Sequence, residues 1–362
     1  MQRRSQQIEL NPSNKQSTLM SKHAGYARVA YNFAVSSFKA GLDNDEWRTY
    51  VDIKREFNAV KYDKFQWCSE LSQNASKNAI HNLGDAVTRW KKGQNSFPVY
   101  KKRSDRISYQ ADNGTGTVEV HKNRINLPKI GWVRMREALR YKGTISKVVV
   151  SKRNNRWFVS ILIDCDISNF NYQPAVLDDK EPMGIDVGIN TLATCSNGDT
   201  YANPRPLKRF ERKLARANRA LSRKIKGSQN WHKAKAILSG VHYRIACIRE
   251  DAHHQASIRI IRKASAIGIE TLNISGLLKN RKLAKALSDS AFSGFLTLLK
   301  YKADRRGIPI TEADQFFASS KTCSSCGHKK ADLTLSDRRY HCSECGLDID
   351  RDLNAAINLC PV

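Results

Sequence analysis

The sequence contains no long apolar run, no internal repeat and no low-complexity tract. A helix that spans a bilayer needs roughly 20 consecutive apolar residues, and no stretch of the 362 residues approaches that length. Residues 1–15 also lack the apolar core of a secretory signal peptide. We therefore expect a cytoplasmic protein with no membrane partner.

Acidic residues are scarce relative to basic ones. The chain has 34 Asp and Glu residues against 62 Lys and Arg residues, which gives a formal net charge of +28. Its apolar content of 40% excludes a wholly disordered basic tail, because that much apolar surface can compensate the entropy lost on folding. A globular chain with this charge predicts a polyanionic partner, and nucleic acid fits better than a membrane surface. At about 150 residues per domain, the length indicates two or three domains.

The first half of the chain alternates between extended and helical patterns. Residues 3–10 form a short extended segment, residues 15–92 have the apolar spacing of several helices, and short β-rich runs follow. The last two of these runs, residues 145–150 and 156–163, predict a hairpin. The pattern indicates a small β-barrel or meander that begins with residues 3–10 and contains an inserted helical block.

The second half begins with a buried-strand pattern at residues 183–189. Residues 191–196 and the turn at residues 197–199 then predict a hairpin. The elements expected further along the chain are a strand (267–274), helices (278–307), a strand (308–313) and a final helix that starts at Asp352.

Residues 205–226 are the most basic segment of the chain. They contain ten cations and one acid, Glu211, together with a narrow apolar seam from Leu207 to Ile225, and a second seam runs from Ile237 to Ala252. Two antiparallel helices packed along these seams would satisfy both patterns. A solvated charged coiled coil is the alternative, but such helices mix charges of both signs, so we favour contact with nucleic-acid phosphates. The candidate contact residues are Lys208, Arg209, Arg212, Arg216, Arg219 and Arg223.

Four of the nine cysteines form two equally spaced pairs. Cys323 and Cys326, then Cys342 and Cys345, are each separated by two residues, and a glycine follows each pair. This spacing predicts four thiolates around one structural Zn²⁺ with no open coordination position, since the alternative of four unrelated thiols does not explain the two pairs. The neighbouring histidines are interpreted as bystanders, and the remaining cysteines as reduced, scattered residues rather than a disulfide framework.

Three acidic residues interrupt apolar segments. Asp186 and Glu270 lie in predicted strands, and Asp352 opens the predicted final helix. Each has an ordinary alternative: Asp186 as a turn former, Glu270 as an edge-strand charge and Asp352 as a helix N-cap. If they meet, their charges require a cation, and carboxylate oxygens suit a pair of Mg²⁺ or Mn²⁺ ions.

Five segments between about residues 182 and 359 follow one another in a distinctive order: Gly184–Gly188, Arg249–Ser257, Ile269–Ile274, Ser319–Gly327 and Asp350–Asn358. These motifs, in this order, resemble the TnpB family, the RNA-guided endonucleases encoded by insertion sequences and related to type V CRISPR effectors. A weaker resemblance extends to residues 97–102 and 127–131.

The resemblance implies a multidomain α+β protein. An N-terminal wedge-like β-barrel with an inserted helical bundle would precede an RNase H-like (RuvC) α/β nuclease domain with an inserted zinc ribbon. The implied boundaries are a barrel at residues 1–16 and 96–168, a helical recognition lobe at 17–95, a linker at 169–181, a nuclease domain at 182–318 and 347–362, and a zinc ribbon at 319–346.

The resemblance also assigns roles to the three acids. It implies that Asp186 on the first strand of the nuclease core, Glu270 on the fourth strand and Asp352 on a late helix are the catalytic residues and hold two Mg²⁺ or Mn²⁺ ions. Asp350 competes for the third role, but the acid of the family directly precedes the pattern x-Asn-Ala-Ala, which selects Asp352.

The implied activity is RNA-guided cleavage of DNA next to a short flanking motif by two-metal-ion hydrolysis of a phosphodiester. The implied partners are a guide RNA (an omega RNA), target DNA and a separate transposase, in the nucleoid of a prokaryotic cytoplasm. Three alternatives remain open: a nuclease-inactive RNA-guided DNA-binding regulator, a cut-and-join transposase, and a guide-free zinc protein that binds DNA.

Overall fold

The chain divides into two compact units, Met1–Tyr172 and Gln173–Val362, each described here by itself. Within the described residues, no helix combines the length and the apolar character needed to cross a membrane. Most of the predicted linker, residues 169–179, lies outside the described residues. The computed structural model describes residues 2–103, 107–113, 116–165, 180–334 and 337–361.

The first unit contains a seven-stranded sheet in the order β2-β6-β7-β1-β5-β4-β3. The long strands β6 and β7 form the predicted hairpin, and β1 pairs with β7 along most of its length. In the described part of the unit the end strands β2 and β3 do not pair with each other, so a closed barrel stays a prediction. The strands are β1 (Gln2–Asn11), β2 (Ile107–Asp112), β3 (Glu119–His121), β4 (Arg124–Leu127), β5 (Gly131–Met135), β6 (Thr144–Arg153) and β7 (Arg156–Cys165).

Helices connect β1 to β2, as the helical block in the sequence predicts. They are α1 (Asn14–Asp43), α2 (Tyr50–Lys64), the short 3-10 helix η1 (Gln66–Glu70) and α3 (Gln73–Lys91). Capping boxes begin α1 and α2, where Ser13 and Thr49 accept hydrogen bonds from backbone amides of the first turn. The buried side chains of these helices and of the sheet belong to one continuous core.

The second unit is built around a five-stranded sheet in the order β10-β9-β8-β11-β12. Strand β11 runs parallel to both of its neighbours, β8 and β12, whereas β9 pairs antiparallel with β8 and with β10. A parallel pair needs a long crossover, and the chain between β8 and β11 supplies it. The strands are β8 (Glu181–Asp186), β9 (Thr191–Cys195), β10 (Thr200–Ala202), β11 (Ala264–Glu270) and β12 (Ile310–Ala313).

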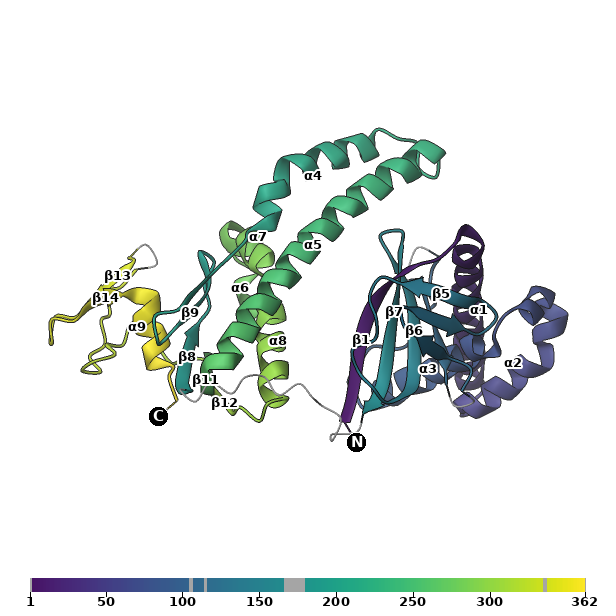
Figure 1. Cartoon of the computed structure of the whole chain (residues 1–362), viewed down its shortest axis with the longest axis horizontal. Helices are drawn as coiled ribbons and strands as arrows, with labels where there is room; N and C mark the ends of the chain where they lie inside the picture. The colour runs from purple at the N-terminus through teal and green to yellow at the C-terminus, as the bar shows by residue number, and fades with distance from the viewer. Residues whose placement is uncertain (1, 104–106, 114–115, 166–179, 335–336, 362) are drawn as a thin grey trace. The chain divides into compact units, whose positions relative to one another are not determined.

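That crossover contains the two predicted antiparallel helices, α4 (Pro206–Ser222) and α5 (Gln229–Lys263), which lie side by side (Figure 1). Leu214 packs against Val241 and Ile245 along the predicted seams. The prediction that the seams reach the tip of the hairpin is wrong. Ile225 is 83% exposed because α4 ends before it. Ile237 is 63% exposed, and the neighbouring Leu238 packs against the Leu214 cluster in its place.

Helices cover both faces of the second sheet. Side chains on one face, including Ile185 and Ile267, join a core with buried residues of α5 and of α8 (Phe292–Asp304). Along the chain, the short helices α6 (Ile274–Leu277) and α7 (Arg281–Ser290) connect β11 to α8. The final helix, α9 (Arg351–Asn358), packs against β8 and β9 (Figure 1).

Two paired glycines allow α9 to approach the sheet. Gly184 of β8 and Gly268 of β11 are register partners. A Cβ atom placed on Gly184 would lie 1.9 Å from the carbonyl oxygen of Ala356, and one placed on Gly268 would lie 1.7 Å from that of Leu359. Because backbone atoms cannot yield as a flexible side chain does, no larger residue fits at either position without moving α9.

We predict that Gly268→Ala displaces α9 and destabilises the second unit by at least about 3 kcal/mol, the upper part of the range for overpacking. Differential scanning calorimetry should show a melting temperature lower by about 6–12 °C. The matched control is Gly294→Ala, whose added Cβ would meet the His253 ring at an ordinary 3.7 Å. Equal melting temperatures for both variants would contradict the close contact.

Candidate functional site

The alternation of side chains along β8 and β11 directs two of the predicted acids to the same face. Successive residues of a strand point to opposite faces, so Asp186 shares the face of Gly184, and Glu270 shares the face of Gly268. That face is covered by α9, which carries Asp352. A Cβ placed on Gly188, just after β8, would lie 4.0 Å from Oδ2 of Asp352. The structure therefore brings the three acids to one end of the sheet beneath α9.

The electrostatics of Asp186 show that the acids interact. Burial, together with the negative charges of Glu270 and Asp352, raises the pKa of Asp186 to about 8. The positive charge of Arg351 acts in the opposite direction. A carboxyl group in this position is costly to ionise unless more positive charge is brought near it.

Two residues that the sequence did not single out contact the other acids. The Ser319 hydroxyl donates a hydrogen bond to Oε1 of Glu270. Nη2 of Arg351 lies 3.1 Å from Oδ1 of Asp352 in an ion pair that is largely shielded from solvent. Ser319 opens the segment Ser319–Gly327 and Arg351 directly precedes Asp352, so their positions within these motifs were the available signal.

The geometry separates the roles of Asp350 and Asp352. Asp350 is the N-cap of α9, and its Oδ1 accepts hydrogen bonds from the backbone amides of Asp352 and Leu353. The alternative in which Asp352 serves as the N-cap is therefore wrong. The edge-strand alternative for Glu270 is also wrong, because β11 is paired on both sides.

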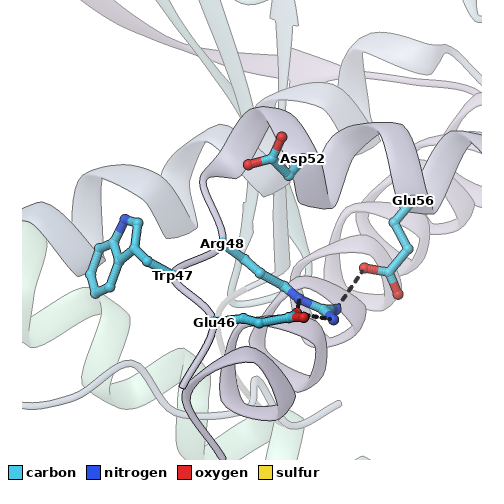
Figure 2. A pocket seen from close by; sticks show the side chains of 5 residues that line it. All are labelled: Glu46, Trp47, Arg48, Asp52 and Glu56. Atoms are coloured by element: carbon cyan, nitrogen blue, oxygen red, sulfur yellow. Dashed lines mark hydrogen bonds and ion pairs between the residues drawn. The ribbon is translucent and has the colours of Figure 1, made fainter. Parts of the chain in front are cut away.

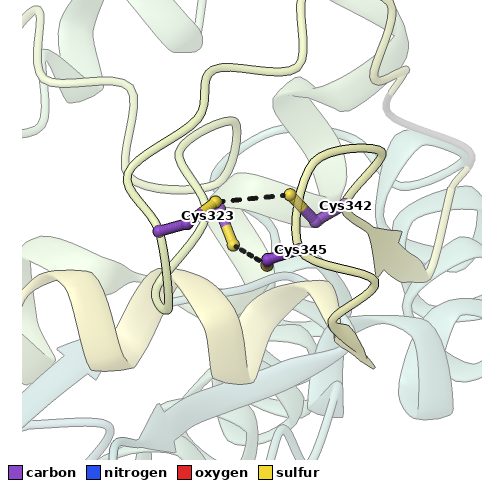
Figure 3. Close-up of side chains that lie close together, drawn as sticks. Cys323, Cys342 and Cys345 are labelled. Atoms are coloured by element: carbon purple, nitrogen blue, oxygen red, sulfur yellow. Dashed lines mark hydrogen bonds between the residues drawn. The ribbon is translucent and has the colours of Figure 1, made fainter.

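The four paired cysteines form one cluster (Figure 3). Their sulfur atoms all lie within 4.8 Å of one another, with 3.6 Å between Cys323 and Cys345 and 3.6 Å between Cys326 and Cys342. A tetrahedral Zn²⁺ with Zn–S bonds of about 2.3 Å places its sulfurs about 3.8 Å apart. The observed spacing fits such a site and is far too long for a disulfide bond of about 2.05 Å. Among the described His, Cys, Asp and Glu residues, no other group of three or more is drawn together this closely.

Backbone amides favour the thiolate form of two of these cysteines. Burial opposes ionisation of Cys323, but hydrogen bonds from the amides of Cys326 and Ser325 lower its pKa to about 7. The amides of Cys345 and Glu344 lower the pKa of Cys342 in the same way. Thiolates are the form that binds a metal ion.

Asparagines of α9 join the cysteine cluster to the acids. Asn354 is fully buried; it donates to the carbonyl of Thr322 at 2.7 Å and accepts from the amide of Ser324 at 2.9 Å. Asn358 donates to the carbonyls of Ser319 and Thr322. The first cysteine pair is therefore tied to the helix that carries Asp352.

The six candidate phosphate-contacting cations lie on α4 and at its end, and all six are exposed. Five of them recur at intervals of three or four residues, which places them along one face of the helix. None of the six forms an ion pair with an acid in the described part of the chain. The five residues of this stripe are Lys208, Arg212, Arg216, Arg219 and Arg223.

An acid from another helix fixes the start of this cationic helix. Asp289 of α7 is almost fully buried and accepts hydrogen bonds from the amides of Leu207 and Lys208, at 2.8 and 3.0 Å. Arg249 of α5 donates to the carbonyl of Asp289 at 2.9 Å. A negative charge at a helix N-terminus is favourable, so Asp289 holds α4 and α5 at a defined position on the second unit.

Two cavities have linings that do not include the three acids. One, of about 670 Å³, is in the first unit, where Arg48 pairs with Glu46 and Glu56 beside Trp47 (Figure 2). The other, of about 330 Å³, is lined by β10 and by Arg259, Arg262 and Lys263 at the end of α5. Neither is lined by a predicted catalytic residue.

Comparison with known proteins identifies the family. A family model described as "Probable transposase" matches residues 162–281, and a model described as "Cas12f1-like, TNB domain" matches residues 292–359. A putative RNA-guided DNA endonuclease of Streptomyces pristinaespiralis is 32% identical over 354 residues, which cover 96% of this chain and 86% of the relative. The chain belongs to the TnpB family. A putative RNA-guided DNA endonuclease of Escherichia coli is 26% identical to this TnpB chain, over 97% of it and 90% of the relative.

The solved structures that resemble this TnpB chain are more distant. The mini-RNA-guided endonuclease CRISPR-Cas_phi3 is 8% identical with a TM-score of 0.49, and the match covers 98% of this chain and 92% of that one. A Cas12f1–sgRNA–target DNA complex is 14% identical with a TM-score of 0.38, over 99% of both chains.

A third family model, described as a helix-turn-helix domain, matches residues 1–40. In this TnpB chain those residues form the strand β1 and most of the single helix α1. The segment therefore does not have the two short helices that this description implies.

We predict that the purified protein contains one zinc ion per chain, measured by inductively coupled plasma mass spectrometry. Cys342→Ser should lose that zinc and unfold the cysteine segment, because a three-thiolate site cannot close the tetrahedron. Cys247→Ser changes a cysteine outside the cluster and should retain one zinc per chain. Full zinc occupancy in Cys342→Ser would contradict the assignment.

Proposed function

We propose that this chain is an RNA-guided DNA endonuclease of a transposable element, which cleaves DNA next to a short flanking motif. The observation that carries the proposal is the meeting of Asp186, Glu270 and Asp352 beneath α9. The relatives that cover 96% and 97% of the chain are named putative RNA-guided DNA endonucleases, which supports the same activity here. In a guided nuclease, base pairing with the RNA selects the sequence, and the protein contacts phosphates and a short motif.

The three carboxylates fit hard divalent cations, and we assign them two Mg²⁺ or Mn²⁺ ions. Burial disfavours the charged form of Asp186, and the neighbouring acids do so as well, so cations would stabilise the ionised group. Bound there, two such ions would activate a water molecule and stabilise the leaving 3′ oxygen of a phosphodiester. Within the chain, Ser319 orients the Glu270 carboxylate, and Arg351 holds that of Asp352.

We also propose the finer domain division that the family implies. An RNase H-like nuclease domain at residues 182–318 and 347–362 is supported by Asp186 on the first strand of the second unit, Glu270 on the fourth and Asp352 on the last helix. A zinc ribbon at residues 319–346 is supported by the cysteine cluster. A wedge-like barrel and a helical recognition lobe in the first unit would hold guide RNA and read the flanking motif.

A cut-and-join transposase is the alternative. One family model is described as "Probable transposase", but the relatives that cover 96% and 97% of the chain are named RNA-guided DNA endonucleases, so this alternative is not favoured. A nuclease-inactive regulator is disfavoured because all three acids are present and lie together. The separate transposase that the family implies as a companion remains part of the proposal.

We predict that the protein, co-expressed with RNA encoded around the 3′ end of its gene, cuts a plasmid that carries a guide-matched target beside a randomised flank. Cutting should require Mg²⁺ and depend on the guide. Asp186→Ala and Asp352→Asn should reduce the rate at least about 100-fold, since even changes to groups that orient metal ligands cost about 10- to 100-fold.

The matched control is Asp350→Ser, which removes a nearby charge but keeps a side chain able to cap α9. It should cut at close to the wild-type rate. Cutting that ignores the guide would favour a guide-free nuclease, and strand joining would favour the transposase. Wild-type cutting no faster than Asp186→Ala would refute the catalytic assignment.

We predict that the cationic stripe on α4 contacts phosphates. Replacing Arg212, Arg216 and Arg219 together with Gln should weaken binding to nucleic acid. It should also flatten the slope of log affinity against log salt, by about 0.9 for each phosphate of duplex DNA that the variant no longer neutralises. Fluorescence anisotropy over a range of NaCl concentrations measures both quantities.

The control replaces the same three arginines with Lys, which keeps the charge and should keep the salt slope. Circular dichroism should show the same helix content for both triple variants, because all three side chains are exposed. An unchanged slope in the Gln variant would show that the stripe is a solvated face.

A further inference from the structure

The segment that follows β12 exposes an aromatic side chain close to the carboxylates. Phe316 is 87% exposed, the largest exposed fraction of any large apolar side chain in the described part of the chain, and Phe317 is 41% exposed. An exposed phenylalanine forgoes the stabilisation that burial of its ring would bring. The exposed ring of Phe316 is therefore available for contact with a partner.

Hydrogen bonds hold the backbone around Phe316 in a defined turn. Oδ1 of Asp314 accepts from the amide of Phe316 at 2.8 Å, and the carbonyl of Asp314 accepts from the amide of Phe317 at 3.0 Å. The carbonyl of Phe317 in turn accepts from the amide of Ser319 at 3.0 Å. The exposure of Phe316 is therefore a consequence of an ordered turn.

Both ends of this turn are anchored at Glu270 and its neighbour. Ala313 is the register partner of Glu270, and its carbonyl accepts from Oγ1 of Thr271 at 2.7 Å. At the other end, Ser319 donates to the Glu270 carboxylate. Phe316 is three residues from each anchor, and three residues of fully extended chain span at most about 11 Å. The Phe316 backbone must therefore lie within that distance of the anchors.

We infer that Phe316 stacks on an unpaired base of the DNA strand that enters the carboxylate site. The inference rests on the proposed nuclease function. Aromatic side chains stack on any base, which suits an enzyme whose sequence choice comes from a guide RNA. A base held on Phe316 would keep the neighbouring phosphate close to Glu270, and the net charge of +28 favours a nucleic acid over other partners.

The first test compares cleavage rates of guide-loaded complexes. Loss of one stacked base changes binding roughly 5- to 150-fold, so Phe316→Ala should slow cutting within that range. Phe316→Tyr keeps an aromatic face and should cut at close to the wild-type rate. Phe316→Leu keeps an apolar side chain without a ring and should resemble the alanine variant. Melting temperature and zinc content should not change, because the ring has little packing to lose.

The second test measures stacking without cleavage. In an Asp186→Ala background, 2-aminopurine is placed at successive positions of the single strand released by guide pairing. Its fluorescence should be quenched at one position, and adding Phe316→Ala should restore the emission there. Equal emission in both proteins at every position would overturn the inference.

The outcomes separate the inference from the proposed function. If wild type cuts, Asp186→Ala does not and Phe316→Ala cuts like wild type, the stacking inference alone fails. If Phe316→Leu cuts as fast as Phe316→Tyr, the stacking inference also fails, because an apolar side chain without a ring would then be sufficient. That result would indicate a generic apolar contact, such as one with a protein surface. If wild type does not cut although guide pairing releases the single strand, the proposed nuclease function fails, and the 2-aminopurine measurement still decides whether Phe316 stacks on a base.

Discussion

The contact between α9 and two glycines is the constraint on which the candidate active site depends. Asp186 and Glu270 lie two residues beyond Gly184 and Gly268, so they share the face on which the helix backbone rests. Any side chain larger than hydrogen at the glycines would separate the third acid from the first two. The three acids therefore meet because a glycine lies two residues before each of the two strand acids. These glycines let α9 approach the sheet, and the acids alone would not bring the helix there.

The same contact sets the charge balance of the site. The carboxylates of Asp186 and Glu270 on the sheet and of Asp352 on α9 repel one another, and burial adds to the free-energy cost of ionising Asp186. The chain offsets part of this with Arg351 on Asp352 and Ser319 on Glu270. The candidate phosphate-contacting cations lie on α4 and at its end, on an exposed helix whose start is fixed by Asp289. The three acidic side chains and the basic side chains of α4 thus lie in separate places within the second unit. A protein that binds a polyanion through cations and holds metal ions through carboxylates needs this separation.

Much of this arrangement could be read from local sequence patterns, because the decisive signals were short. Equal cysteine spacing and two facing apolar seams need no knowledge of distant contacts, and both the cluster and the α4–α5 pair are confirmed. The contacts of Ser319 and Arg351 could not be predicted, because they depend on how β12, α9 and the cysteine segment meet in space. The seam was predicted to include Ile225, which periodicity alone could not show to lie beyond the end of α4.

The cysteine cluster and the acids, which look like separate motifs in sequence, form one hydrogen-bonded assembly. Asn354 and Asn358 form hydrogen bonds with the backbone of Thr322 and Ser324, which bracket Cys323, and both side chains project from the helix that carries Asp352. Ser319 belongs to the same connection, since it contacts Glu270 through its hydroxyl and Asn358 through its carbonyl. A structural metal in the cluster would therefore hold α9 against the two glycines as well as shape its own loop. This accounts for the position of the cysteines immediately before the third acid, where closing the cluster also places the helix.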